Sequence, residues 1–433
     1  MHLFRRRFAL PAVNCQMLFV GAILALLVLQ PPPDPEIPPI SLEDRISLPY
    51  SELLEPASYS QKEFESLRSR IEHERDEKIE SLKKTEKLWK DELDAARSEL
   101  EELNRGKSVD TPGTSARRTQ LHIDIGALER GIPEKVHEQK VTIPGEYDER
   151  LAKLWLIEHW PERRDEILQR IEQGSGRERR HGDVDDIGYR HIAKDPQEDI
   201  GIGRQAARQM AAGGWLPAEL QDVDVQNYVR KVADRIAANS DLKVPLHVTV
   251  VDSGDLRATA LPGGFLFVPS GVLLASHTES ELAGILSREI ARIAARQVSR
   301  ASKRSLVSRM FMPIAQIATG VFSGGINPGA YYGIGYGMQG LSGIVDRVMD
   351  GDKAKYQKEA DQLGIQYAWK AGFDPRGSLE FLESQEADAG LHERILNLFS
   401  EITYLRPQKN AVVDSPEFQA VRARLRTHTR PPS

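Results

Sequence analysis

The stretch that decides the fold is residues 281–297, ELAGILSREIARIAARQ, which has the apolar spacing of a buried helix. Thr278 followed by Glu281 matches the pattern that caps a helix N-terminus, so we expect the helix to begin there. On a helical wheel, Glu289 lies among four apolar side chains: Leu282, Ile285, Leu286 and Ile293. The sequence therefore predicts a carboxylate within an apolar stripe, which is costly to bury unless it is paired or in contact with water.

The centre of this helix, Arg288-Glu-Ile-Ala-Arg292, has the outline of the zinc-binding pattern H-E-x-x-H, with an arginine in place of each histidine. In H-E-x-x-H, two histidines on one helix face bind zinc and the glutamate acts as a general base. R-E-x-x-R alone is a weak signal, because an internal Glu289–Arg292 ion pair explains it without any reference to zinc. The sequence around the helix has to decide between the two interpretations.

Regular patterning continues on both sides of the helix. Residues 202–210 and 223–238 have helical spacing, whereas residues 246–251 and 265–268 have the pattern of strands. We therefore expect an α+β domain, mostly helical, over residues 198–405. Residues 406–433 are expected to form a C-terminal tail.

Ordered blocks in this half of the chain resemble the zinc metallopeptidase family M48, which includes HtpX, the CAAX prenyl protease and BepA-like periplasmic proteases. The blocks are Ile202-Gly-Arg-Gln-Ala-Ala-Arg208, Ala258-Thr-Ala-Leu-Pro-Gly-Gly-Phe-Leu-Phe-Val268, Glu281 to Gln297, Lys358-Glu-Ala-Asp-Gln-Leu-Gly364 with Ala371-Gly-Phe-Asp-Pro375, and Val413-Asp-Ser-Pro-Glu-Phe-Gln-Ala-Val421. The resemblance implies a zincin-like fold that acts on proteins or peptides. It also implies a peptide-binding edge strand, made of Phe265, Leu266, Phe267 and Val268.

The resemblance further implies which positions would bind zinc: the two motif histidines and a glutamate that precedes the aspartate of the second motif. In this chain those positions are Arg288, Arg292 and Gln357. Only Glu289, at the position of the general base, and Asp361, at an orienting position near the ligands, match the family.

Zinc needs three protein ligands from histidine, cysteine or carboxylate side chains. Arginine is always protonated and has no lone pair to give, and glutamine is a feeble neutral ligand. A site made only of carboxylates, from Glu289, Glu359 and Asp361, would favour magnesium or calcium instead. We therefore expect no zinc cofactor, a vestigial base at Glu289 and a cleft that persists as a cationic pocket.

These observations predict a catalytically inactive peptidase homologue, a pseudopeptidase, which binds a protein or peptide segment by strand addition. One alternative is an active zinc-dependent metalloendopeptidase with ligands that the pattern does not reveal. A second alternative is a structural tether in which the globular domain only oligomerises. The net charge of −6 gives no reason to expect nucleic-acid binding, and a single cysteine excludes a disulfide within the chain.

The N-terminus predicts an attachment to a membrane. Arg5, Arg6 and Arg7 precede an uncharged run over residues 8–29, which is long enough to cross a bilayer, since a crossing needs about 20 residues. We expect residues 1–30 to be an uncleaved anchor, with the bulk of the chain on the periplasmic side of the inner membrane. A cleaved signal peptide is the alternative, because polar residues weaken the first third of the run.

Two segments between the anchor and the domain have their own patterns. Residues 31–59 are a proline-rich spacer, and residues 60–105 carry a heptad seam made of Ile79, Leu82, Trp89, Leu93, Ala96, Leu100 and Leu103. The seam predicts either a coiled coil that forms a homo-oligomer or stalk, or a long helix packed on its own domain.

Two further segments have less regular patterns. Residues 106–197 are a linker region of unknown fold, with a strand expected at 120–125 and a helix at 147–173. Within the domain, residues 310–344 are apolar and glycine-rich, which indicates a lid or a contact with a membrane surface. A buried, turn-rich connection is the alternative.

Overall fold

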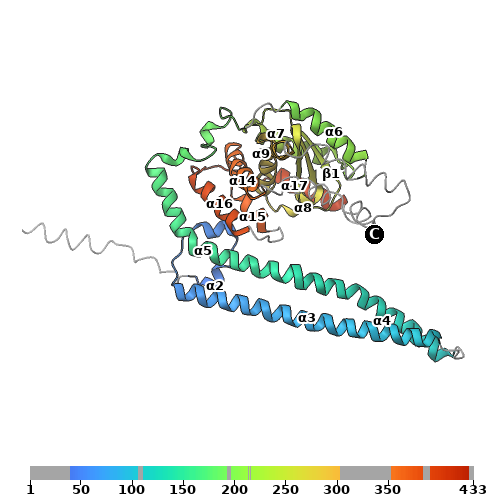
Figure 1. Cartoon of the computed structure of the whole chain (residues 1–433). Helices are drawn as coiled ribbons and strands as arrows, with labels where there is room; N and C mark the ends of the chain where they lie inside the picture. The colour runs from blue at the N-terminus through green and yellow to red at the C-terminus, as the bar shows by residue number, and fades with distance from the viewer. Residues whose placement is uncertain are drawn as a thin grey trace, which may run out of the picture.

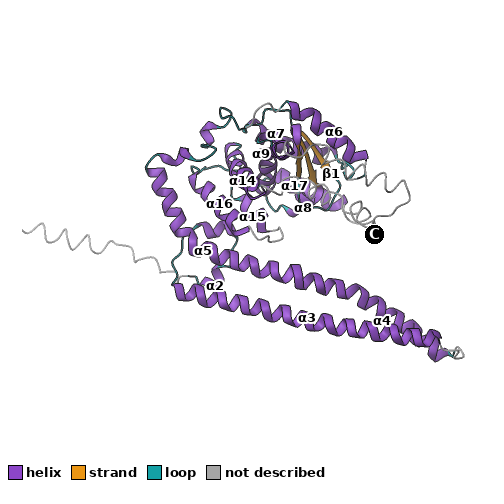
Figure 2. Ribbon diagram, in the orientation of Figure 1, coloured by secondary structure: helices purple, strands orange, loops and turns teal. Residues whose placement is uncertain are grey.

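The computed structural model describes residues 40–105, 111–192, 197–212, 214, 216–302, 353–383 and 391–428. A mostly helical body carries a long helical hairpin that projects from it (Figure 1 and Figure 2). The expected anchor and the glycine-rich insert lie outside the described residues, as does the first part of the proline-rich spacer. Among the described residues, every helix is too short or too polar to cross a membrane.

The hairpin consists of two antiparallel arms. The first arm is α3 (Gln61–Arg105); the second is a continuous run of α4 (Pro112–His137), the π-helical turn η2 (Glu138–Thr142) and α5 (Ile143–Glu172). Thr111 caps α4, and its side chain accepts a hydrogen bond from the backbone of Thr114. The helix expected at residues 147–173 is confirmed, but the strand expected at 120–125 is wrong, because these residues belong to α4.

The heptad seam of α3 faces the second arm of the same chain. Trp89 lies over Gly131 of α4, where a Cβ atom would come within 2.7 Å of the indole ring, so the missing side chain makes room for the tryptophan. Arg97 bonds to Glu129 across the two arms at 2.7 Å. The seam thus packs against the second arm of a projecting hairpin, an arrangement that differs from both a helix packed on its own domain and a coiled coil between chains.

The body contains a three-stranded sheet of β1 (His247–Val251), β2 (Thr259–Leu261) and β3 (Phe265–Pro269), in the order β1-β3-β2. β3 runs parallel to β1 and antiparallel to β2. Gly263 and Gly264 have φ angles of 74° and 98°, which lets the chain reverse between β2 and β3 within a tight turn. The two strands expected from the sequence are confirmed as β1 and β3; β2 is an addition.

The position of β3 corrects one prediction about the site. Phe265, Leu266, Phe267 and Val268 were expected to form the edge strand, but they lie in the middle of the sheet, because the turn at Gly263 and Gly264 folds β2 back along them. Strand addition to β3 is therefore blocked on both sides. β1 is also covered, since the side-chain amide of Gln226 accepts from Val250 N at 3.0 Å and donates to Val250 O at 2.8 Å.

Helices surround the sheet and build most of the core. α7 (Val223–Ala238) packs on β1, and α9 (Glu279–Ala294) packs on β2 and on α7. Thr278 caps α9 with the expected capping box. The other helices of the body are α6 (Glu198–Ala212), α8 (Ser270–Ala275), α10 (Gln297–Ser302), α14 (Lys353–Lys370), α15 (Gly377–Glu383), α16 (Leu391–Tyr404) and α17 (Pro416–His428).

The C-terminal residues belong to the body. α17 packs on α7 and α8, and Phe418 and Leu425 are completely buried. Residues 416–428 were expected to be part of a tail beyond the domain, so that boundary is wrong. The apolar spacing of this short helix did not predict that it packs on α7 and α8 and completes the core of the body.

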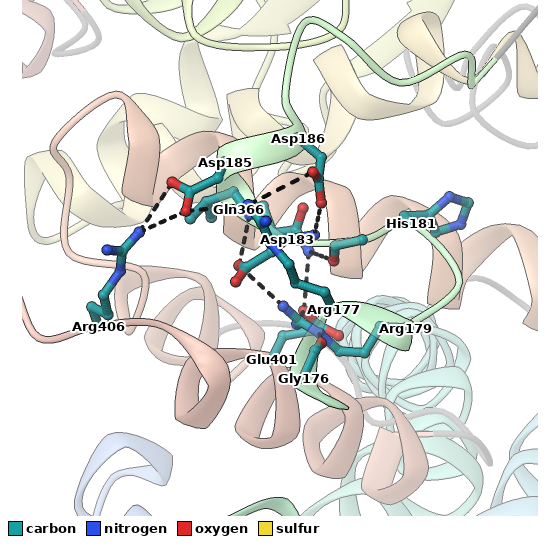
Figure 3. Close-up of polar contacts among 12 residues, drawn as sticks. Gly176, Arg177, Arg179, His181, Asp183, Asp185, Asp186, Gln366, Glu401 and Arg406 are labelled. Atoms are coloured by element: carbon teal, nitrogen blue, oxygen red, sulfur yellow. Dashed lines mark hydrogen bonds and ion pairs between the residues drawn. The ribbon is translucent and has the colours of Figure 1, made fainter. Parts of the chain in front are cut away.

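Contacts of α5 and of the chain that follows it fix the hairpin to the body. Trp160 of α5 packs edge-on against Phe399 of α16, with ring centroids 5.1 Å apart. After α5, residues 174–192, here called the strap, cross α14 and α16 through the polar contacts in Figure 3. Arg179 of the strap is paired with Glu401 of α16, as Figure 3 shows. Arg190 of the strap donates to Gln366 of α14 at 2.8 Å.

The strap includes the 3₁₀ turns η3 (Ser175–Glu178) and η4 (Val184–Asp186). The chain preceding the hairpin forms α2 (Leu42–Arg45) and the 3₁₀ turn η1 (Tyr50–Leu54), which lie against α3, α5 and α15. Much of the region expected as a linker of unknown fold is therefore an integral part of one packed structure.

Candidate functional site

A cleft of about 180 Å³ opens beside the centre of α9. Residues from α9, α14, α15 and α16 line it, and residues 256–258, which precede β2, form its rim. The helices come unusually close here: a Cβ atom on Gly364 of α14 would lie 2.9 Å from Cα of Arg288. This close approach sets the two sequence motifs side by side.

Glu289 lies at the inner wall of the cleft and its side chain is only 3% exposed. Arg292, one turn further along α9, donates to both carboxylate oxygens at 3.2 and 3.3 Å. The backbone N–H of Ala260 in β2 donates to Oε2 at 3.2 Å, and Nη1 of Arg288 lies 3.6 Å from Oε1. The expected charge pairing of Glu289 with Arg292 is present, with an additional bond to the outer edge of β2.

Asp361 of α14 is the second buried carboxylate, with 2% of its side chain exposed. Arg288 donates to it through Nε at 2.9 Å, and Arg394 of α16 binds it through Nε at 2.6 Å and Nη2 at 3.0 Å. Burial by itself would raise the pKa of the Asp361 carboxyl, but Arg394 and Arg288 hold that pKa below its ordinary value. Asp361 is therefore an anion that joins three helices.

Together these contacts form a chain of alternating charges, Arg292–Glu289–Arg288–Asp361–Arg394. Here we call it the charge chain. An arginine stands at each end, so the five residues carry one more positive than negative charge. The carboxylates lie deepest, whereas the arginine side chains are between 10% and 28% exposed. The charge chain thus gives the cleft a cationic surface over a buried anionic layer.

Comparison with known proteins identifies the family of the region that contains the charge chain. The model of peptidase family M48 matches residues 221–429, which contain every residue of the charge chain. The chain carries a domain of peptidase family M48. The region around it is similar to beta-barrel assembly-enhancing proteases: that of Yersinia pestis is 28% identical over 192 residues, which are 43% of this chain and 37% of the relative.

The corresponding protease of Escherichia coli (strain K12) is 24% identical over 190 residues, again 43% of this chain and 37% of the relative. A putative beta-barrel assembly-enhancing protease of Vibrio cholerae is 28% identical over 163 residues, 37% of this chain and 33% of the relative. The chain thus matches little more than a third of the length of these relatives. The hairpin lies outside the M48 match.

The side chains of this M48 domain do not fit the zinc ion that the sequence resemblance implies. At two of the three positions, guanidinium groups point at carboxylates and have no lone pair for a metal. At the third, Gln357 lines the cleft and is half-buried, and an amide oxygen alone makes a weak ligand. We therefore derive no catalytic step through a metal at this site.

The alternative site made only of carboxylates does not form either. Glu359 and Asp361 are two residues apart on α14, so they point to opposite sides of the helix. Glu359 accepts from Gln297 at 2.9 Å and pairs with Arg300 of α10, so its partners differ from those of Asp361. Within the described ranges, no three histidine, cysteine, aspartate or glutamate side chains lie close enough together to hold a metal ion.

Three contacts at or near the site were not predicted from the sequence. Arg394 is thirty-three residues beyond Asp361, and no motif links the two. The bond from Ala260 N depends on how β2 lies against α9. His181 of the strap places Nε2 at 3.7 Å from Glu359, although the strap is remote in sequence from the M48 motifs. Of these three contacts, only the bond from Ala260 had a signal in the sequence, because Ala260 lies two residues before the Pro262-Gly-Gly turn.

Proposed function

We propose that this chain is a catalytically inactive peptidase homologue that binds a protein or peptide segment in the cell envelope. The observation that carries the proposal is the charge chain: Arg288 and Arg292 stand at two zinc-ligand positions and bond to Asp361 and Glu289. The residues that replace the zinc ligands are thus held by the two carboxylates that remain from the family pattern.

The loss of ligands has a direct chemical consequence. Without a metal, no bound water is brought to a pKa near neutral, and a general base has no activated water to deprotonate. Glu289 is also engaged, because it accepts hydrogen bonds from Arg292 and from the backbone of Ala260. In this arrangement Glu289 stabilises the fold of the cleft and is not presented to a substrate.

Binding of a peptide requires neither a metal ion nor a general base. The cleft remains open beside Glu289, and exposed residues of the 256–258 rim lead into it. Since β3 is central, we propose that a peptide contacts the cleft and its rim and does not add a strand to β3. The matched relatives are named for enhancing beta-barrel assembly, which supports a protein as the partner.

Metal analysis of the purified full chain tests the proposal. We expect no tightly bound zinc and no cleavage of an unfolded protein such as casein. The variant Arg288→His/Arg292→His/Gln357→Glu restores three zinc donors and serves as the matched control, which should bind about one zinc ion. A wild-type chain with about one zinc and chelator-sensitive cleavage would contradict the proposal and favour the active-enzyme alternative.

The structural-tether alternative needs a separate test. Trp89 lies opposite Gly131, so deleting residues 86–134 shortens both arms of the hairpin by matching lengths. We expect the shortened chain to keep its peptide binding, because the cleft lies in the body. Loss of peptide binding in a shortened chain that still folds would favour a function that depends on the length of the hairpin.

We also propose that residues 1–30 anchor the chain in the membrane and that the rest is exported. The support is the sequence alone: three arginines precede a long uncharged run. Cell fractionation followed by N-terminal sequencing should find the full-length chain with the membranes. A soluble chain that begins near residue 30 would show instead that the segment is a cleaved signal peptide.

A further inference from the structure

We infer that the helical hairpin bends at its middle, so that its outer half changes direction relative to the body. The hairpin lies outside the region that matches family M48, and this inference is independent of the proposed function. It follows from the backbone of the second arm, from the polar side chains between the arms and from the distribution of buried apolar side chains along them.

The place of the bend, here called the joint, is the part of the hairpin between two contacts that join the arms. On the side toward the body, Nζ of Lys78 lies 5.1 Å from the ring centroid of Tyr147. On the outer side, Trp89 lies over Gly131. The joint therefore comprises residues 79–88 of α3 and residues 132–146 of the second arm.

The backbone of the second arm is interrupted within the joint. Pro133 lies inside α4 and has no N–H group, so it cannot donate the hydrogen bond that a helix makes at that position. The π-helical turn η2 follows, and there the N–H of Ile143 donates to the carbonyl of Glu138, five residues earlier. Sharp helix kinks occur mainly at prolines and at π turns. In contrast, α3 contains neither glycine nor proline along its whole length.

Two polar side chains lie between the arms at the joint. Gln139 of η2 is 7% exposed, and its Nε2 group is buried without a hydrogen-bond acceptor among the described residues. A buried donor without a partner is unfavourable, so a conformation in which water reaches the amide costs less here than in an apolar interface. Glu86 interrupts the apolar seam of α3; its side chain is 18% exposed and pairs with Lys90 of its own helix at 2.6 Å. The arms are therefore held together less firmly at the joint.

The buried core is also interrupted along the hairpin. The continuous core of the body extends outward as far as Ile71 of α3 and Ile143 of α5. Within α3, which is described along its whole length, no residue between Ile71 and Leu93 is buried. Leu93 is buried further out, as are Leu121 and Ile125 of α4, and these three do not belong to the core of the body. The outer half therefore has buried side chains of its own and can keep its packing when the joint bends.

Together these features leave α3 as the helix that continues through the joint. The stiffness of a helical hairpin depends on both helices and on the contacts that keep them from sliding past each other. At the joint one helix is interrupted and the contacts are partly polar, so bending is resisted mainly by α3. Residues 89–105 of α3 lie beyond the joint and extend about 25 Å, since each residue of a helix adds ~1.5 Å. A bend of about 20° would displace the outer end of α3 by about 9 Å.

Distances between spin labels test the inference on the full chain carrying Cys15→Ser, which removes the native thiol. One label replaces the exposed Arg230 on α7 of the body. The second label replaces either Ser98, beyond the joint, or His73, on the body side of it; both are exposed. Double electron–electron resonance gives the distribution of each distance. We expect the Ser98 distribution to be wider than the His73 distribution by about 9 Å, the displacement that the bend produces.

Variants that repair the second arm show whether the width arises at the joint. Pro133→Ala restores a backbone donor at an exposed position, so it should narrow the Ser98 distribution without removing packed atoms. Combining it with Gln139→Leu, which removes the unpaired amide, should reduce the excess width at least about twofold. Pro161→Ala is the matched control and should leave both distributions unchanged, because Pro161 also lies inside a helix, α5, but on the body side of the joint.

Hydrogen exchange followed by mass spectrometry distinguishes a joint from gradual fraying of the outer end. We expect the amides of residues 134–143 to exchange at least about tenfold faster than those of residues 121–130 and 147–156. Exchange that rises steadily toward the outer end would indicate fraying and would overturn the inference. Equal widths for the two label pairs would also overturn it, as would a wide Ser98 distribution that the repaired variants do not narrow.

Discussion

Removal of the Glu289 carboxylate should destabilise the body substantially. Glu289→Ala deletes the partner of Arg292 and the acceptor for the backbone N–H of Ala260, both inside the protein. The side chain is only 3% exposed, so water cannot readily take its place. The same substitution in an open, solvated cleft would cost no more than about 1 kcal/mol.

The contacts allow the size of the effect to be estimated. Removing one partner of a buried ion pair costs about 3–5 kcal/mol, because the other charge is left uncompensated. Arg288 keeps its bond to Asp361, and Arg292 has a further interaction, so neither arginine loses every partner. We therefore expect the lower end of the range, about 3 kcal/mol.

Glu289→Gln should have an intermediate effect. The amide keeps an oxygen for the N–H of Ala260 but loses the charge that balances Arg292. Since a hydrogen bond with a charged partner contributes about 1.5–3 kcal/mol and a neutral one about half as much, the glutamine variant should lose about 1–2 kcal/mol. A graded loss from wild type through glutamine to alanine separates the effect of charge from that of shape.

Urea denaturation of the full chain, followed by circular dichroism, measures these changes as shifts in the transition midpoint. Glu417→Ala is the matched control: Glu417 pairs with Lys231 at 2.6 Å, but both side chains are more than half exposed. That variant should lose no more than about 1 kcal/mol. If Glu289→Ala were neutral or stabilising, or no worse than Glu417→Ala, the conclusion that the ion pairs of Glu289 stabilise α9 against its neighbours would be refuted.

Two further predictions concern other parts of the body. Burial lowers the pKa of His181 although Glu359 opposes the shift, so the unfolded chain binds the proton more readily than the folded chain. The free energy of unfolding should therefore fall as the pH drops below about 6.5. His181→Gln should flatten this slope, whereas the control His277→Gln, at an exposed site, should not. Gly364→Ala should destabilise the body by about 1–3 kcal/mol in the same denaturation assay, because the added Cβ would meet the backbone of Arg288. The control Gly126→Ala adds only an ordinary contact in α4, so it should stabilise that helix by about 1 kcal/mol.

Local patterns predicted the elements that form the core of the domain. α7 occupies the predicted residues, 223–238, and the capping box at Thr278 begins α9 as expected. These predictions succeed because caps and apolar periodicity are set by neighbours in the sequence. The charge pairing of Glu289 with Arg292 belongs to the same class, since it joins residues one helical turn apart.

Predictions that depended on tertiary arrangement were less successful. β2 has three residues, too few for a periodic signal, and its return along β3 turned the expected edge strand into a central one. The partner of the α3 seam was also missed, because Gly131 and Pro133 interrupt the apolar spacing of α4. Trp89 packs over Gly131 because the glycine has no side chain, and a glycine in a helix gives no apolar spacing that would predict such a contact.

The charge chain explains why arginine, and not a neutral residue, suits the former ligand positions. Two buried carboxylates, Glu289 and Asp361, remain from the family pattern, and each needs a positive neighbour if it is to stay charged. Neutral side chains at 288 and 292 would leave Glu289 without a cation and Asp361 with Arg394 alone. Guanidinium groups one turn apart on α9 reach both carboxylates, and Arg394 extends the bonding to α16. The arrangement thereby joins three helices, α9, α14 and α16, through ion pairs whose carboxylates are buried.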